Sequence, residues 1–224
     1  TTKVPDQKTK GGSAAINNSL TYSHGAVTRG DSTQKKIAIV FTADEFADGG
    51  FYISDVLQKE NVNASFFLTG NFYRNPAFKN MIRTLKTNGH YLGSHSDKHL
   101  LYCDWTKRDS LLVTQNEFEN DLRNSYKAMA AFGIKEDGAN YFMPPYEWYN
   151  DSIAAWTNLL NKQLINFTPG TLSNADYTTP DMKNYRSSDT IFESILRYEQ
   201  THTSGLNGFI LLLHTGTDSK RTDK

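Results

Sequence analysis

Six short apolar segments alternate with segments of helical periodicity, and this alternation constrains the fold more than any other feature. The predicted strands span residues 36–42, 64–69, 91–93, 140–143, 164–167 and 209–213. The predicted helices span residues 51–60, 76–88, 114–132, 152–160 and 187–200. No hairpin turn separates these strands, so each one returns to the sheet through a crossover, and the sheet is predicted to be parallel.

The strand–helix unit recurs every ~25–35 residues, as in a (β/α) barrel of the TIM type. Only about ten residues follow the last predicted strand, where a closed barrel would need another helix and strand. We therefore expect an α/β fold, a distorted barrel that is open or truncated at its C-terminal end. Residues 1–34 lack periodicity and are rich in small polar residues. They predict an N-terminal tail (1–14) and a surface arm (15–34) ahead of one domain at 35–224.

The charge balance and the single cysteine exclude several kinds of partner and site. Lys plus Arg and Asp plus Glu both number 24 in the 224 residues, so the formal net charge is zero. A neutral chain without a basic block argues against nucleic acid and anionic membrane as partners. Its apolar runs are far shorter than the roughly 20 residues that span a bilayer, so no transmembrane segment is expected. The one cysteine, Cys103, excludes an internal disulfide and a cysteine-cluster zinc site.

Polar side chains gather directly after the predicted strands. In parallel α/β folds, functional residues lie at the carboxyl ends of the strands, on one rim. These positions hold Asp44 and Glu45 after the first strand, His95 and His99 after the third, 144–148 after the fourth, and His214 after the last. We expect these groups to face one another across one end of the barrel.

The two histidines and the two adjacent carboxylates have the composition of a metal site. His95 and His99 stand four residues apart, so both imidazoles can reach one cation. Asp44 and Glu45 point in different directions at a strand end, so one can complete a His/His/carboxylate site while the other acts as a general base. The alternatives are two solvated loop histidines and a pair of charges that caps a strand.

His214 and the loop aromatics each have two interpretations. His214 follows an apolar strand and must find a polar partner, either as a general acid or base at the rim or as a satisfied core histidine. Flat aromatic faces on a polar rim suit sugar rings, and ordinary loop packing is the alternative for each. The aromatic residues on these loops are Tyr102, Trp105, Tyr146, Trp148 and Tyr149.

The motif at residues 89–99 resembles that of the polysaccharide deacetylases of the NodB-homology type, carbohydrate esterase family 4. It reads Gly-His-Tyr-Leu-Gly-Ser-His-Ser-Asp-Lys-His, where that family has Gly-His-x-hydrophobic-Gly-x-His-Ser/Thr-x-x-His. Residues 64–70 resemble its second strand, residues 41–45 its Thr-Phe-Asp-Asp signature, and residues 212–214 its closing Leu-x-His. The resemblance runs in matching order over residues 36–214.

The resemblance implies a role for each matching residue. Asp44 takes the place of the catalytic base, and His214 that of the catalytic acid. Glu45, His95 and His99 take the places of the metal ligands, for one divalent metal with zinc as the default and cobalt or nickel as alternatives. Leu212 would line the pocket for the acetyl methyl group, and the backbone N–H of Tyr146 would help the oxyanion. Trp148 is assigned to substrate contact.

The family also implies a fold, a substrate and a location. The expected fold is a distorted barrel of about seven strands. The expected partner is an acetylated oligo- or polysaccharide, with the acetyl group linked through nitrogen or oxygen. The variants at residues 44–46 and 168–171 resemble those of a divergent branch of secreted bacterial proteins, so an extracellular or periplasmic location is expected.

Three departures from the family pattern bear on activity. Glu45 stands where the family has Asp and is one methylene longer. Met143 stands where an arginine would stabilise the ionised base, so activity should be weak or shifted to higher pH unless Lys98 or Arg186 supplies the charge. The acidic residue that orients the acid histidine has no clear counterpart, and the candidates are Asn166, Asp176 and Asp218.

Three functions are therefore compared. The first is a metal-dependent deacetylase that removes acetyl groups from a carbohydrate. The second is a catalytically weak or inactive glycan-binding domain on the same barrel, which Met143 favours. The third is a metal hydrolase that cleaves a non-carbohydrate amide. Acetate release from acetylated sugars, with and without a chelator, separates the first two.

Overall fold

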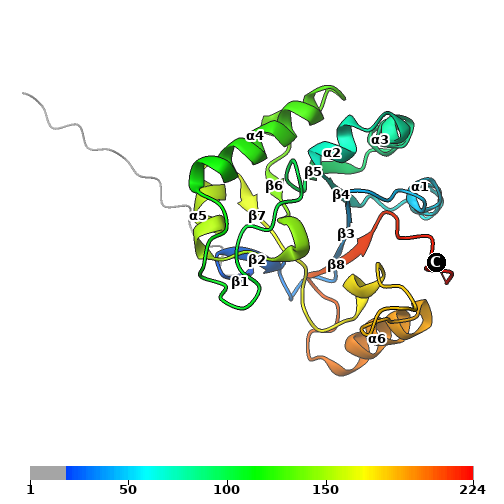
Figure 1. Cartoon of the computed structure of the whole chain (residues 1–224). Helices are drawn as coiled ribbons and strands as arrows, with labels where there is room; N and C mark the ends of the chain where they lie inside the picture. Colours follow the sequence, from blue (N-terminus) through cyan, green and yellow to red (C-terminus); the bar gives the residue numbers. More distant parts are fainter. Residues whose placement is uncertain (1–18, 224) are drawn as a thin grey trace, which may run out of the picture.

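The computed structural model describes residues 19–223, and its centre is a curled sheet of parallel strands. The order across the sheet is β7-β6-β5-β4-β3-β8. Figure 1 shows these strands curving around a common centre. Their bounds are β3 Ile37–Ala43, β4 Ser65–Leu68, β5 Tyr91–Ser94, β6 Tyr141–Phe142, β7 Gln163–Leu164 and β8 Phe209–His214. The predicted parallel, open barrel is confirmed.

Helices follow the strands and cover the outside of the sheet (Figure 1). They are α1 Gly50–Lys59, α2 Gly70–Arg74, α3 Lys79–Thr87, α4 Gln115–Ala130, α5 Asp151–Leu159 and α6 Ser188–Thr201. The longest, α4, begins with a capping box in which Thr114 and Glu117 each accept from the other's backbone N–H. Among the described residues, no helix has both the length and the apolar character needed to cross a bilayer.

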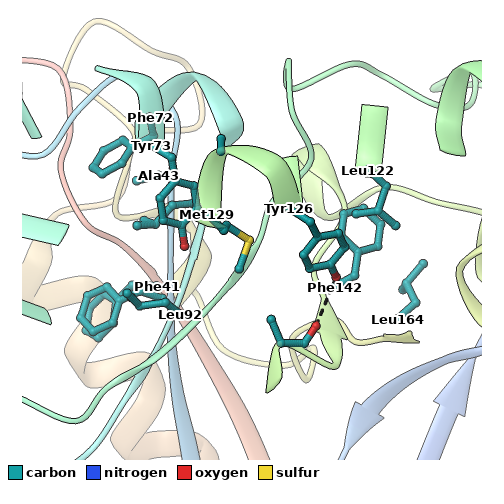
Figure 2. Close-up of a cluster of buried hydrophobic side chains, with 14 of the residues drawn as sticks. Phe41, Ala43, Phe72, Tyr73, Leu92, Leu122, Tyr126, Met129, Phe142 and Leu164 are labelled. Carbon is teal, nitrogen blue, oxygen red and sulfur yellow. Dashed lines mark hydrogen bonds between the residues drawn. The ribbon is translucent and has the colours of Figure 1, made fainter. Parts of the chain in front are cut away.

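Side chains alternate between the two faces of the sheet and form two apolar clusters. The outer cluster lies between the strands and the helices and includes Phe41, Phe142 and Leu122. Figure 2 shows this cluster, in which the Tyr126 hydroxyl donates to the carbonyl of Ala139 (3.3 Å). The inner cluster fills the barrel with Val27, Val40, Phe67, Met143, Ile210 and Leu212. A parallel sheet buried on both faces explains why its strands are apolar at almost every position.

An N-terminal hairpin occupies the gap between the two ends of the curled sheet. Strand β1 (Thr21–Ser23) pairs with β2 (Ala26–Arg29), and every residue of β2 is buried. Val27 bridges to Ile165 beyond β7, and the Gly30 N–H donates to the carbonyl of Gly208 before β8. Part of the predicted surface arm is therefore a buried strand, because it pairs with both free edges. The predicted tail at 1–14 lies outside the described residues.

Arg29 ties this hairpin to the segment before β8. Its guanidinium is buried and donates to the carbonyls of Gly205 (2.7 Å) and Asn207 (2.8 and 3.0 Å) and to the Tyr198 hydroxyl (3.0 Å). The planar fork of Arg suits several fixed acceptors at once. The contact therefore joins residues about 170–180 positions apart in the chain.

We predict that Arg29→Leu lowers the free energy of unfolding by roughly 2–4 kcal/mol, because it leaves buried carbonyls without a donor. Urea denaturation followed by circular dichroism measures the change. Arg123→Leu is the matched control, since Arg123 is half exposed and only pairs with Glu119 along its own helix. That variant should stay within about 0.5 kcal/mol of the parent. Equal losses in both variants would contradict the prediction.

Candidate active site

Side chains that continue the inward series of the strands meet at the carboxyl end of the barrel. Thr42 is in register with Phe67 on one side and with His214 on the other. Two residues further along β3 and β4, the Thr69 hydroxyl donates to the Asp44 carboxylate (2.7 Å). His95 continues the inward series of β5. The period of two along each strand thus places Asp44, His95 and His214 on one rim.

His95 and His99 face each other on this rim. Their Nε2 atoms lie 3.3 Å apart. The Nδ1 of His95 lies 2.9 Å from the carbonyl of Met143, which can only accept, so Nδ1 carries the proton and Nε2 presents a lone pair. Burial, helped by the neighbouring His99, holds the pKa of His95 well below its ordinary value. Burial also lowers the pKa of His99, against the opposing effect of Asp44. Both rings are therefore neutral, the form that binds metals.

The loop that carries the two histidines is fixed by a buried carboxylate of α4. Asp121 accepts from the backbone N–H groups of Asp97 (3.0 Å) and Lys98 (3.2 Å) and from the Tyr102 hydroxyl (2.8 Å). Ser96 accepts from the His99 N–H (2.9 Å) through its hydroxyl. Ser96 and His99 both have positive φ, 75° and 55°, which non-glycine residues seldom adopt. The network holds a strained loop in the shape that brings the imidazoles together.

Asp44 has a hydroxyl and an imidazole beside it rather than a cation. Over residues 19–223 no Lys or Arg forms an ion pair with its carboxylate. Lys98 is exposed, and the Arg186 guanidinium donates to the carbonyl of Tyr185 (2.7 Å). Met143 is completely buried in the inner apolar cluster. An arginine at that position would place a charge among aliphatic side chains, so the missing cation is a feature of this barrel's packing.

Asp176 orients His214. Its Oδ1 lies 2.6 Å from His214 Nδ1, and its Oδ2 accepts from the His214 backbone N–H (2.7 Å). Burial alone would lower the pKa of His214, but the charge and hydrogen bond of Asp176 raise it above its ordinary value. Of the three candidates for this role, the structure brings only Asp176 to the ring. Asn166 instead donates to the carbonyl of Glu147 (2.8 Å), and Asp218 accepts from the Lys220 N–H (2.9 Å).

Glu147 also turns into the site, although no role was predicted for it from the sequence. Its Oε1 lies 3.9 Å from His95 Nε2 and is buried without a hydrogen-bond partner. Burial raises the pKa of Glu147 to about 7, while His214 acts in the opposite direction. Tyr146 and Glu147 have φ of 58° and 53°. Of the seven non-glycine residues with positive φ in the described chain, these two and the pair near His95 lie at this site.

Glu45 does not join the histidine pair. It is exposed and lines a separate cavity of about 630 Å³ with Phe46, Phe51 and nearby residues that include neither histidine. Beyond the end of β3 at Ala43, Asp44 is half-buried and accepts from the Thr69 hydroxyl, whereas the neighbouring Glu45 is exposed. Within residues 19–223, no three His, Cys, Asp or Glu side chains already stand close enough to hold a metal ion. The facing Nε2 atoms of His95 and His99 fit a cation, and in the described residues Glu45 forms no ion pair with either ring.

The aromatic residues of the rim divide into exposed and packed rings. Tyr146 and Trp105 are about half exposed. Tyr146 packs against His99 with ring centroids 4.3 Å apart, and Trp105 lies 5.6 Å from Tyr146. Trp148, assigned to substrate contact, is instead covered by the Arg108 guanidinium at 3.7 Å. Tyr102 and Tyr149 are buried, so loop packing explains them. Tyr146 and Trp105 are therefore the open aromatic surface beside the histidines.

Leu212 is completely buried in the inner cluster, two residues before His214 on the same face of β8. It therefore lies beneath the rim rather than on the outer surface of the barrel. Among the residues that sequence reasoning left without a role, Glu147 and Asp121 are the important ones. Glu147 lies two residues after the second of the two prolines that follow β6, within the run of residues 144–148 already placed on the rim. Asp121 gives no local signal, because only the fold brings α4 under the loop.

Comparison with known proteins identifies the family. A family model described as polysaccharide deacetylase matches residues 29–165. An uncharacterised 30.6 kDa protein in the fumA 3′ region of Geobacillus stearothermophilus is 26% identical over 201 residues, 88% of this chain and 66% of that protein. The peptidoglycan-N-acetylmuramic acid deacetylase PdaA of Bacillus subtilis is 25% identical over 150 residues, 66% of this chain and 52% of PdaA. The chain thus spans about half to two thirds of the curated relatives.

Solved structures show the same fold. The structure of Bacillus subtilis PdaA, a family 4 carbohydrate esterase, has a TM-score of 0.66 at 21% identity and covers 88% of this chain and 75% of its own. BA3943 of Bacillus anthracis, described as a CE4 family pseudoenzyme, has a TM-score of 0.66 at 18% identity and covers 87% of this chain and 60% of its own. Because the family model matches more than half of the residues, this chain belongs to the polysaccharide deacetylase family.

Proposed function

We propose that this protein is a metal-dependent deacetylase that hydrolyses acetyl groups on a carbohydrate. The observation that carries the proposal is the meeting of Asp44, two neutral facing imidazoles and the Asp176–His214 pair on one rim. A base, a cation-binding pair and an acid are the groups that acyl hydrolysis needs. Family membership and the relationship to PdaA support the carbohydrate substrate class.

The chain's own residues divide the reaction between them. His95 and His99 hold the cation, which when bound polarises the acetyl carbonyl and acidifies water. Asp44, positioned by the Thr69 hydroxyl, takes the proton of the attacking water. His214, protonated and held by Asp176, gives a proton to the leaving amine or alkoxide. The Tyr146 backbone N–H is the proposed oxyanion donor. The open rings of Tyr146 and Trp105 give a sugar a flat surface to stack on.

The second candidate is a glycan-binding domain without efficient catalysis. Met143 and the absence of an ion pair to Asp44 in the described chain favour it. The barrel of BA3943 is described as a pseudoenzyme, and a mutant of that protein as having restored enzymatic activity. For both candidate functions, deacetylase and glycan-binding domain, we propose an extracellular or periplasmic location, because polymeric cell-wall carbohydrate lies outside the plasma membrane.

We predict that the purified chain releases acetate from acetylated oligosaccharides, that a chelator abolishes the release, and that Zn²⁺ or Co²⁺ restores it. Asp44→Asn should lower the rate by roughly 10²–10⁴-fold, because it removes the base. That variant should still bind metal. Enzymatic detection of acetate and elemental analysis measure the two effects. Glycan binding without acetate release in any metal-loaded sample would instead favour the non-catalytic domain.

We predict that Asp176→Asn moves the alkaline limb of the pH–rate profile to lower pH by about 1–2 units, because an opposite charge no longer raises the His214 pKa. A general acid with a lower pKa loses its proton earlier as pH rises. Asp181→Asn is the matched control, since Asp181 is exposed and pairs with Lys220 on the surface. An unmoved limb in Asp176→Asn would exclude His214 as the acid.

A further inference from the structure

The Glu147 carboxylate is a buried acidic group at the site to which the proposed reaction assigns no role. Its Oε1 is fully buried, has no hydrogen-bond partner and faces the lone-pair nitrogen of His95. At 3.9 Å the two atoms are too far apart to form a hydrogen bond with each other. Burying a carboxylate oxygen without a donor or a cation is costly. A positive charge placed between the two atoms would satisfy both.

The backbone is strained in order to aim this side chain inward. Tyr146 and Glu147 occupy consecutive left-handed conformations, which non-glycine residues seldom adopt. The Asn166 side chain donates to the Glu147 carbonyl and holds the turn from the segment after β7. Strain kept at a buried, unpaired acidic group is typical of a binding position rather than of simple packing.

We propose that Glu147, and not Glu45, supplies the carboxylate ligand to the metal held by His95 and His99. The inference rests on the metal site of the proposed function, and it names a ligand that follows β6 instead of one that follows β3. Glu45 follows β3, is exposed and lines a separate cavity whose lining includes neither histidine, so its side chain is turned away from the pair. Glu147 already lies 3.9 Å from His95 Nε2.

The assignment leaves Asp44 free for catalysis. Its carboxylate accepts from the Thr69 hydroxyl at 2.7 Å and acts on His99 by its charge, which opposes the lowering of the His99 pKa by burial. Two neutral imidazoles and one carboxylate, with a position open to water, form the usual ligand set of catalytic zinc. The carbonyl of Met143 accepts a hydrogen bond from His95 Nδ1 and fixes the orientation of the ring. Metal-binding histidines commonly make such a hydrogen bond through the nitrogen that does not bind the metal.

Metal binding to matched Glu→Gln variants tests the proposal. The parent, Glu147→Gln, Glu45→Gln, Asp44→Asn and His95→Ala are stripped with chelator and titrated with Zn²⁺ in a calorimeter. Elemental analysis gives the metal content, and Co²⁺ absorption reports the ligand set. We expect about one equivalent in the parent, in Glu45→Gln and in Asp44→Asn. Affinity should fall by more than ~100-fold in Glu147→Gln and His95→Ala, since losing even an outer partner costs 10–100-fold.

A thermal melt separates a ligand from a merely structural residue. Without metal, Glu147→Gln should melt at or above the parent temperature, because the amide removes an unpaired buried charge. With Zn²⁺, the parent and Glu45→Gln should gain stability and Glu147→Gln should not. A metal-free melting temperature well below that of the parent would mean that Glu147 acts in packing, and would overturn the proposal.

The remaining outcomes distinguish this proposal from the proposed function. If Glu147→Gln binds Zn²⁺ like the parent while Glu45→Gln or Asp44→Asn loses it, the ligand assignment is overturned and the metal-dependent deacetylase stands. If the parent binds no more metal than His95→Ala, both are overturned. Loss confined to Glu147→Gln and His95→Ala supports both.

Discussion

Alternation of side chains along parallel strands is the constraint on which the barrel and its rim depend. On β3 the inward series runs through Val40 and Thr42 to Asp44, and on β8 through Ile210 and Leu212 to His214. The lower positions fill the barrel with apolar side chains, and the last ones carry polar groups into the mouth. A shift of one residue in either strand would exchange the two faces and remove the site.

The loops that carry the buried histidines and Glu147 are stabilised by hydrogen bonds from the layer beneath them rather than by ion pairs among the site residues. Two histidines are kept neutral by burial, and the Glu147 carboxyl pKa is raised to about 7. Left-handed backbone at four rim residues adds strain of about 1–3 kcal/mol each. Asp121 beneath one loop and Asn166 beneath the other hold these conformations through hydrogen bonds. Stability is thus concentrated in the layer below the site.

The apolar interior explains why a methionine can stand where a cation was expected. Met143 packs with residues of β2, β3, β4 and β8, so its side chain belongs to the filling of the barrel. Its carbonyl nevertheless serves the site, because it fixes the tautomer of His95. One residue thus fills the core through its side chain and orients a ligand through its backbone.

Local periodicity determined the number and the parallel sense of the six central strands, because crossover helices leave a strong signal over ten or more residues. It also determined which residues lie on the rim. Asp44, His95 and His99 come directly after a strand or in the loop that follows it, and His214 is the last residue of β8. The motif at residues 89–99 identified the family, because histidines that bind one metal from a short loop must keep a fixed spacing.

Only the tertiary structure decided which rim residues act together. The hairpin of β1 and β2 is short and weakly patterned, and its place depends on the free edges of strands far away in the chain. Asp176 reaches His214 across 38 residues, and Glu147 reaches His95 across 52, distances over which spacing carries no information. Adjacent carboxylates look equivalent in a sequence. The fold distinguishes them, because Asp44 meets the Thr69 hydroxyl after β4 whereas Glu45 is exposed and lines a separate cavity.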